Sequence, residues 1–242
     1  MIDIKGLVAG YGGLDIVRGV DLSVERGGIT CIVGPNGAGK STVLKAVSGV
    51  LRPRAGSVTI DGTDLAGQEP EAILRAGVAQ VPQRHGLFTR LTVRQNVLMG
   101  AYVIRKQRKR IESRYDALAA TFPVLASRAG APAGTLSGGQ RRMVEFARAL
   151  MLDPKVVLLD EPTLGLDPAS LAIIGDSVRA MVEAGTTILM VEQNVRVGLS
   201  LASHGCVLTA GTVALSGTAS EIAGHPGLMD LFFGEARRAG TR

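Results

Sequence analysis

Hydrophobic and polar residues alternate along the first 30 or so positions, which predicts short β-strands broken by glycine turns at residues 10–13 and 26–28. Ile29–Val33 is then a continuous apolar run that enters a glycine loop, as a strand buried on both faces does. Residues 40–49 change to helical spacing, with their apolar side chains on one face. Residues 57–60, followed by an Asp-Gly pair, predict a β-hairpin.

The pattern changes at about residue 84, where Ala- and Arg-rich helical sequence begins and continues to about residue 150. Apolar strand patterns then return, with helical stretches between most of them, at residues 156–159, 187–191, 206–209 and 212–215. Strands that alternate with helices predict a largely parallel sheet. A further helix is predicted at residues 228–233.

These patterns predict an α/β fold in one domain. We expect a core with a mainly parallel sheet, an antiparallel β portion at the N-terminus and an inserted α-helical lobe. The core would take residues 1–83 and 151–223, the inserted lobe residues 84–150, and a short tail residues 224–242. A chain of 242 residues with 46% hydrophobic content is large enough to bury such a core.

Charge and cysteine content exclude few of the possible ligands and partners. The formal net charge of +6 suits a nucleotide, an acidic protein face or anionic headgroups, and selects none of them. Cys31 and Cys206 stand in apolar strand patterns, outside any CxxC or Cys/His cluster, so we predict core residues rather than metal ligands or a disulfide. The densest basic run has helical spacing and predicts a solvated helix face: Arg105, Lys106, Arg108, Lys109, Arg110 and Arg114.

The apolar stretches are too short to cross a bilayer. Residues 1–5 begin an alternating strand and lack the basic-then-apolar layout of a signal peptide. We therefore expect a soluble chain, which would serve a membrane process through a partner.

The first chemical motif matches the phosphate-loop pattern G-x-x-x-x-G-K-[ST] at every fixed position, between a strand and a helix. Glycines let backbone N–H groups approach phosphate oxygens closely, and a helix N-terminus favours an anion. Lys40 would bring positive charge to the β- and γ-phosphates, and the Ser41 hydroxyl would bind Mg²⁺. We predict that a nucleoside triphosphate is bound by Gly34, Pro35, Asn36, Gly37, Ala38, Gly39, Lys40, Ser41 and Thr42.

The second motif is an apolar strand at residues 156–159 that ends in Asp160 and Glu161. Beside a phosphate loop, the first acid can hold Mg²⁺ through water, and the second can orient or deprotonate the attacking water. A solvated strand end would show the same local pattern. The surrounding second half of a parallel sheet favours the catalytic interpretation.

The third motif is another glycine loop, which leads into a helix expected to begin near Arg141 and consists of Ser137, Gly138, Gly139 and Gln140. A serine cap beside glycines at a helix N-terminus is a second anion-binding arrangement. Because the first loop already satisfies its own nucleotide, we expect the second loop to close over a nucleotide held by another copy.

The order of these motifs resembles the nucleotide-binding domain of an ABC transporter over nearly the whole chain. The resemblance implies that the protein binds and hydrolyses ATP with Mg²⁺, and that two such domains enclose two ATP molecules head to tail. It implies that Tyr11 stacks on adenine and that residues 164–167 cross to the other subunit. It also implies that Glu161 is the general base and that Asp160 and Gln83 attend Mg²⁺, with Gln83 linking the site to a membrane subunit.

The chain departs from the family pattern at Gln193, where the family usually has a His that contacts the γ-phosphate. Gln can donate a hydrogen bond but cannot become a cation near neutral pH. His85, His204 and His225 do not align with that position. We therefore expect Gln193 to sense the γ-phosphate without adding an imidazole step to the pH dependence.

Residues 191–194, Val-Glu-Gln-Asn, resemble one of the two ATPases of branched-chain amino-acid importers, a group related to urea and amide importers. Residues 86–97 and the tail around residues 231–234 share this resemblance, whereas that subfamily often has Glu in place of Gln83. The implied partners are a second ATPase subunit, related or identical, permease subunits that contact residues 84–94, and indirectly a solute-binding protein. The implied location is the cytoplasmic face of the inner (plasma) membrane, as a peripheral protein.

Soluble ABC ATPases that act on DNA or ribosomes are the alternative from another class. DNA-repair members separate the phosphate loop from the acidic strand by long coiled coils, and this chain has no sustained heptads. Translation-factor members carry two such domains, whereas each motif occurs once here. Exporters usually fuse the ATPase to membrane helices. We therefore expect no nucleic-acid partner and favour an importer.

Overall fold

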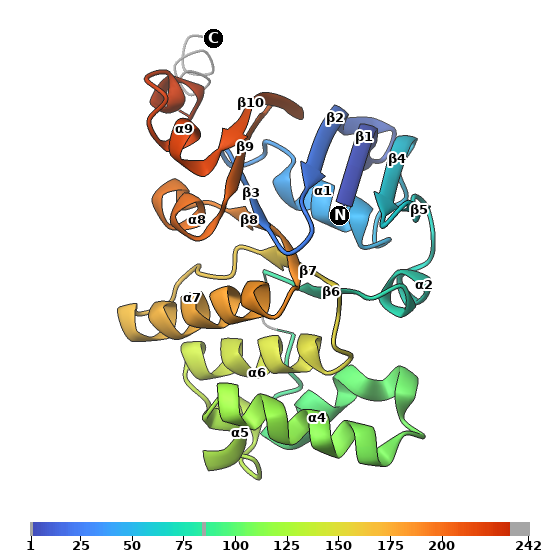
Figure 1. The fold of residues 1–242 in the computed structure, drawn as a ribbon, viewed down its shortest axis with the longest axis vertical. Helices are drawn as coiled ribbons and strands as arrows, with labels where there is room; N and C mark the ends of the chain where they lie inside the picture. Colours follow the sequence, from blue (N-terminus) through green and yellow to red (C-terminus); the bar gives the residue numbers. More distant parts are fainter. Residues whose placement is uncertain (1, 84–85, 233–242) are drawn as a thin grey trace.

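The computed structural model describes residues 2–83 and 86–232, and within them it places two sheets with helices around them (Figure 1). The six-stranded sheet has the order β10-β9-β3-β8-β7-β6, in which β9, β3, β8, β7 and β6 are parallel and β10 is antiparallel to β9. Its strands are β3 (Ile29–Val33), β6 (Val78–Val81), β7 (Val156–Asp160), β8 (Thr187–Glu192), β9 (His204–Thr209) and β10 (Thr212–Thr218). The four-stranded antiparallel sheet has the order β2-β1-β4-β5, with β1 (Ile2–Tyr11), β2 (Leu14–Val24), β4 (Ala55–Ile60) and β5 (Thr63–Asp64). The predicted fold class is confirmed.

The first two strands are longer than the sequence pattern predicts. β1 and β2 pair through most of their length, although their register shifts between Ile4 and Leu7 and again between Ala9 and Gly10. Gly6 lies in the first of these shifts with a φ of 56°. A glycine can absorb such an irregularity inside a strand instead of ending it. The prediction of short strands is therefore wrong here, whereas the predicted hairpin of β4 and β5 is confirmed.

The continuous apolar strands are explained by burial on both faces of the larger sheet. Side chains alternate between the faces of a strand, so Cys31 and Val33 join one hydrophobic cluster and Ile32 joins the other. The first cluster extends into the helices that follow β6, and the second extends to α1 and the smaller sheet. Cys31 and Cys206 are buried free thiols in this core, as predicted.

The helical insertion lies between β6 and β7, in the lower half of Figure 1. Its helices are α3 (Val93–Leu98), η1 (Met99–Ile104), α4 (Arg108–Thr121), α5 (Val124–Ser127), η2 (Ala133–Thr135) and α6 (Gly138–Leu150). The other helices are α1 (Lys40–Val47), α2 (Pro70–Arg75), α7 (Pro168–Glu183), α8 (Val195–Leu201) and α9 (Ala219–Ala223). One hydrophobic cluster continues from the sheet into the insertion, so the proposed lobe boundaries at residues 84 and 150 stay a prediction.

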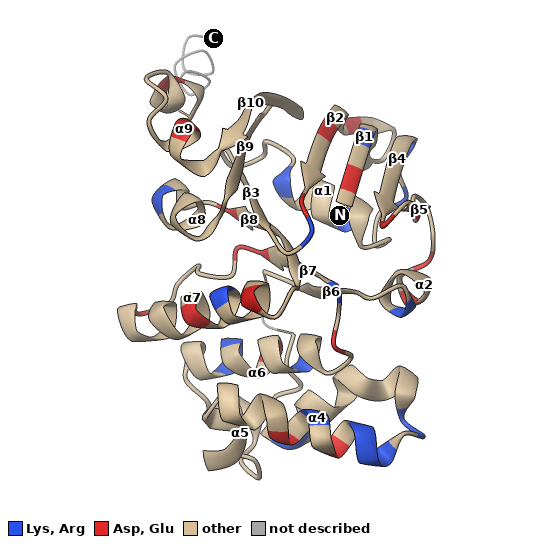
Figure 2. Cartoon of the chain, in the orientation of Figure 1, with Lys and Arg blue, Asp and Glu red and all other residues tan. Residues whose placement is uncertain are grey.

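The basic run lies at the start of α4 and just before it (Figure 2). Its members up to Arg110 are exposed, as a solvated face requires. Arg114 differs, because its Nε donates to the Leu150 carbonyl at 3.0 Å and its guanidinium pairs with Asp153 at 2.9 Å. That residue attaches α4 to the end of α6.

Residues 228–232 are helical, as predicted. The parts of the predictions that concern Arg84, His85, Phe233 and the tail beyond it lie outside the described residues. Among the residues that are described, no helix combines the length and the apolar character needed to cross a membrane.

Candidate functional site

The carboxyl ends of the parallel strands gather the predicted site residues at one edge of the larger sheet. β3 leads into the phosphate loop, β6 is followed by Gln83, and β7 ends at Asp160. β8 lies between β3 and β7 and is followed by Gln193. In open α/β sheets ligands bind outside these carboxyl ends, so the fold itself places the candidate site.

The phosphate loop passes directly into α1, whose first turn has no side-chain cap. Gly39 occupies the N-cap position with a φ of 101°, a left-handed conformation that favours glycine. The N–H groups of the first turn of α1 therefore remain as donors for an anion.

Lys40 is the first residue of α1 and is buried. Its Nζ donates to the carbonyl oxygens of Gly34 at 2.9 Å and Pro35 at 3.0 Å. Burial lowers the pKa of this ammonium, which the carboxylates of Glu161 and Asp160 partly offset. A buried cation in this position gains from an anionic ligand, so the loop fits a polyphosphate.

Ser41 and Asp160, the predicted Mg²⁺ ligands, lie side by side at the start of α1. Ser41 Oγ donates to Asp160 Oδ1 at 3.0 Å. Burial raises the pKa of Asp160, and the hydrogen bond from Ser41 opposes that rise. Within the described residues, no group of three or more His, Cys, Asp or Glu could hold a metal without help. This arrangement fits Mg²⁺, which is usually held by one or two carboxylates together with substrate phosphates.

Glu161 follows β7 in a conformation that is uncommon for a residue other than glycine, with a φ of 47°. Its N–H donates to the Val191 carbonyl of β8 at 2.9 Å, which fixes the turn. Its Oε2 accepts a hydrogen bond from Gln83 Nε2 at 2.7 Å. The structure thus brings together two predicted catalytic residues from different strand ends, and backbone conformations of this kind concentrate at functional sites.

Glu192, which the sequence analysis did not single out, contacts the loop that follows Glu161. Its Oε1 accepts hydrogen bonds from Thr163 N at 3.0 Å and Thr163 Oγ1 at 2.8 Å. Burial raises the pKa of this carboxyl, and the Thr163 hydrogen bonds oppose the rise. An acidic residue at the end of an otherwise apolar strand was the available signal.

The second glycine loop begins its helix earlier than predicted. α6 starts at Gly138 rather than near Arg141, because Ser137 is its N-cap. Ser137 Oγ accepts from Gln140 N at 3.2 Å, and Gln140 Oε1 accepts from Ser137 N at 3.1 Å, which is a capping box. The side-chain Oε1 of Gln140 is therefore occupied by the capping box. A contact between Gln140 and a nucleotide stays a prediction.

The two glycines of this loop have different surroundings. A Cβ on Gly139 would lie 1.9 Å from Ser170 Oγ of α7, so close helix packing requires glycine there. A Cβ on Gly138 would meet no atom within 4 Å. Gly138 and Ser137 are both exposed. Their side of the loop is thus open to a molecule from outside this chain.

Tyr11 and Asp167 lie at the margins of the site. Tyr11 ends β1 with 47% of its surface exposed, and its hydroxyl accepts a hydrogen bond from Lys45 Nζ of α1 at 3.3 Å. Asp167 caps α7, because its Oδ1 accepts from Ser170 N at 3.0 Å and its Oδ2 from Ser170 Oγ at 2.6 Å. The predicted roles of Tyr11 and residues 164–167 toward adenine and a second subunit stay predictions.

Gln193 is exposed after β8. Because a Gln amide does not titrate near neutral pH, we expect the wild-type rate–pH profile to contain no imidazole step from this position. Replacing Gln193 with His should add a step near the ordinary His pKa of about 6.5. Measuring kcat for ATP hydrolysis between about pH 5.5 and 8.5 for wild type, Gln193→His and Gln193→Ala checks this. A Gln193→His variant with unchanged activity and profile would count against any role for Gln193.

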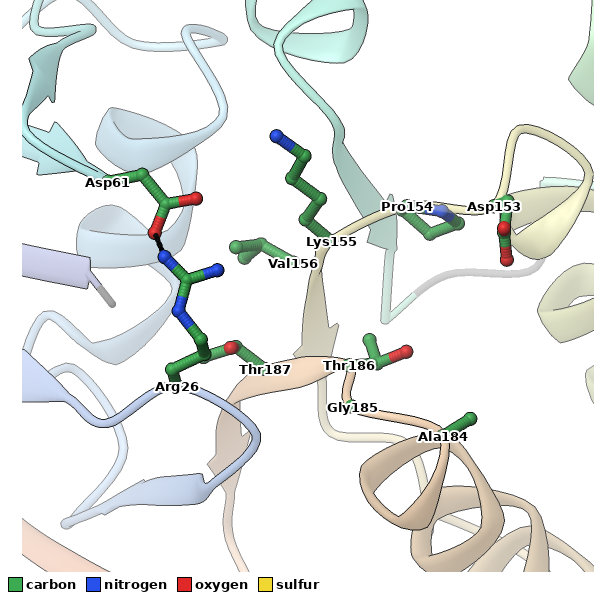
Figure 3. A pocket seen from close by; sticks show the side chains of 10 residues that line it. All are labelled: Arg26, Asp61, Asp153, Pro154, Lys155, Val156, Ala184, Gly185, Thr186 and Thr187. Atoms are coloured by element: carbon green, nitrogen blue, oxygen red, sulfur yellow. Dashed lines mark hydrogen bonds and ion pairs between the residues drawn. The ribbon is translucent and has the colours of Figure 1, made fainter.

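A separate pocket of about 240 Å³ lies at the opposite edge of the sheet (Figure 3). Its lining includes the residues at the beginning of β7 and β8. Arg26 and Asp61 also line it and form an ion pair at 2.5 Å. Because this edge is remote from the carboxyl ends of the strands, the pocket is not part of the candidate site.

The two helices whose starts are predicted to bind anions, α1 and α6, pack against different elements. α1 packs on β1, β2, β7 and β8, whereas α6 packs on α3, η1, α5, α7 and β6. The uncapped start of α1 lies next to Asp160, since Ser41 in its first turn donates to that carboxylate. The exposed start of α6 belongs to the helical insertion.

Comparisons with known proteins agree with this geometry. A family model described as ABC transporter matches residues 17–164. The chain is 38% identical over 226 residues to a probable branched-chain amino acid transport ATP-binding protein LivF of Archaeoglobus fulgidus, covering 93% of this chain and 95% of that protein. It is 35% identical over 224 residues to the high-affinity branched-chain amino acid transport ATP-binding protein BraG of Pseudomonas aeruginosa, with the same coverage of 93% and 95%.

Solved structures show the same fold. A crystal structure of an ATP-binding cassette of an ABC transporter in its ADP conformation superposes with a TM-score of 0.87 at 26% identity, covering 97% of this chain and 98% of the other. A dimeric structure of a bacterial ABC transporter cassette gives a TM-score of 0.78 at 25% identity, covering 90% of this chain and 99% of the other.

Proposed function

The chain belongs to the ABC transporter family as an ATP-binding, ATP-hydrolysing subunit, and on that premise we propose that it energises the uptake of branched-chain amino acids. We propose further that it works as one half of a head-to-tail sandwich of two ATPase subunits. The observation that carries this proposal is that the chain has two helix starts suited to bind an anion, at α1 and at α6, and that they lie in different parts of the fold. α1 serves the nucleotide of this chain, and the start of α6 faces outward with an open side at Gly138.

Within one subunit, the described contacts support a role for each residue at the strand ends. Lys40 and the first-turn N–H groups of α1 would bind the β- and γ-phosphates of ATP. Glu161 would take the proton of the attacking water, and its hydrogen bond to Gln83 would orient the carboxylate. Ser41 and Asp160 would hold Mg²⁺, which neutralises phosphate charge when it is bound.

Across the sandwich, Ser137 and Gly138 would contact the γ-phosphate of the ATP on the partner subunit. Related cassettes form dimers, and a dimeric cassette structure covers 90% of this chain. Since the γ-phosphate would connect the two subunits, closure would depend on intact ATP and hydrolysis would reopen the pair.

Permease contact is proposed for the helical insertion. An apolar groove of about 600 Å³ lies between α3, η1 and α4, with Leu91, Met99 and Tyr102 in its lining. Phe88, in the segment after Gln83, is also exposed to 52%. Large exposed apolar side chains next to a groove favour a protein partner. We therefore propose a peripheral location at the cytoplasmic face of the inner membrane, with a solute-binding protein acting through the permease.

The substrate proposal rests on the branched-chain amino-acid relatives and on the Val-Glu-Gln-Asn segment. It is tested by purifying the chain with its membrane subunits and second ATPase in proteoliposomes. We expect leucine-loaded binding protein to stimulate ATP hydrolysis and leucine uptake, and urea or amides to have no effect. Stimulation by urea or an amide alone would overturn the substrate. Retention of the chain on nucleic acid with no association with membrane subunits would overturn the transport role.

A further inference from the structure

We propose that Arg142 of α6 is a positioning residue for hydrolysis. Its side chain fixes the backbone next to Gln83 and on both sides of Glu161 to α6. It thereby couples these two residues to the glycine loop at the start of the same helix. This inference rests on the proposed sandwich and deepens it. It concerns a buried residue that acts through the backbone carbonyls it holds.

The guanidinium of Arg142 is buried beneath the site, with the residue 2% exposed. Its Nη1 donates to the Pro82 carbonyl at 2.6 Å, and Pro82 directly precedes Gln83. Its Nη2 donates to the Asp160 carbonyl at 3.2 Å. Its Nε donates to the Pro162 carbonyl at 3.2 Å, so the carbonyls on both sides of Glu161 are held by one side chain.

Glu145, one turn further along α6, extends this clamp. Its Oε2 accepts from Arg142 Nη1 at 3.1 Å, and its Oε1 accepts from Gly86 N at 2.8 Å. Arg148 Nη1 donates to the Gly86 carbonyl at 2.7 Å. Pro82 and Gly86 are thus both hydrogen-bonded to side chains of α6.

The chemistry of this position calls for arginine. The planar guanidinium has five N–H donors in a fixed fork, which can serve three carbonyls and a carboxylate together. A lysine ammonium has three donors at a single point and cannot reach the same set. Buried groups deprived of such partners are costly, so the backbones are held firmly.

The same helix carries the exposed Ser137 and Gly138 at its start. Arg142 follows Ser137 by five residues, which is about 7.5 Å along a helix at about 1.5 Å per residue. A short helix segment moves as a rigid unit. If α6 shifts when Ser137 meets the partner's ATP, the three carbonyls held by Arg142 shift with it. The catalytic residues of one nucleotide site therefore take their position partly from the state of the other.

The test separates positioning from stability with Arg142→Lys and with the double variant Arg142→Met/Glu145→Met. The double variant removes both members of the Arg142–Glu145 ion pair together, so that neither is left buried without the other. Tm is measured beside kcat, because the carbonyls of Pro82, Asp160 and Pro162 lose their donor in both variants. We expect both to lower kcat by about 10- to 100-fold, as a small misplacement of a catalytic group does, with KM for ATP within about threefold of wild type. Arg179→Met, which breaks the exposed pair with Asp176 on α7, is the matched control and should leave kcat unchanged.

A double variant that keeps the wild-type Tm and kcat shows that the cluster only balances charge, and overturns the inference. So does an Arg142→Lys variant that retains wild-type kcat. Sedimentation of Glu161→Gln with MgATP is run in parallel, alone and with the second ATPase. If no ATP-dependent dimer forms there, the sandwich itself is wrong and the coupling falls with it. If the dimer forms and kcat survives in Arg142→Lys, only the positioning role falls.

Discussion

Replacing Glu161 with Gln is expected to lower kcat for ATP hydrolysis by about 10²- to 10⁴-fold, the usual contribution of a general base. The amide keeps the size of the side chain and can still hydrogen-bond with Gln83, but it cannot accept the proton of water. The residues proposed to bind the phosphates are untouched, so ATP affinity should stay close to that of wild type. Steady-state turnover and equilibrium ATP binding measure the two effects separately.

Glu183→Gln is the matched control for this substitution. Glu183 ends α7, is exposed, and undergoes the same change of charge. We expect it to retain wild-type turnover. Turnover that survives in Glu161→Gln would mean that another group activates the water.

The second large effect is expected for Gly138→Asp, which should abolish ATP-dependent pairing while leaving the fold intact. A side chain at Gly138 meets no atom of its own chain within 4 Å, and an acid in the first turn of α6 favours the helix. In the sandwich, however, the carboxylate would face the γ-phosphate of the partner's ATP. Two like charges about 4 Å apart repel by about 4 kcal/mol at an effective dielectric constant of about 20, or about 10³-fold in affinity. The readouts are Tm, ATP binding and sedimentation with MgATP.

Gly139→Ala is the informative comparison, because the neighbouring glycine is required inside the chain. Its added Cβ would lie 1.9 Å from Ser170 Oγ, so we expect a loss of stability of about 1–3 kcal/mol, typical of overpacking. Gly138→Asp should show no such loss. A Gly138→Asp variant that still dimerises with ATP as its parent does would contradict the role of the α6 start.

The fold and much of the site could be predicted because their signals are local. Three short segments indicate the chemistry by their residue types and spacing: the phosphate loop, the acidic strand end and the second glycine loop. The parallel sheet then places their strand ends at one edge. The sequence pattern predicts the start of α6 three residues too late, because the capping box of Ser137 and Gln140 lies inside a glycine motif that is typical of a loop.

The supporting residues could not be predicted in the same way, since their partners are remote in the sequence. Arg142 binds the Pro82 carbonyl, 60 residues away, and Glu192 binds Thr163, 29 residues away. An arginine on the apolar stripe of a helix and an acid at the end of a buried strand are weak signals by themselves. Their meaning depends on backbone carbonyls and N–H groups that only the folded chain brings within reach.

In the proposed sandwich, the start of α6 of one subunit completes the nucleotide-binding site of the other. Sedimentation velocity of Glu161→Gln with and without MgATP, alone and with the second ATPase subunit, tests it directly, with Glu161→Gln/Gly138→Asp as the paired sample. We predict a dimer that requires MgATP and is lost in the double variant. A Glu161→Gln chain that binds ATP but stays monomeric in both settings, or a dimer that is indifferent to Gly138→Asp, would contradict the claim.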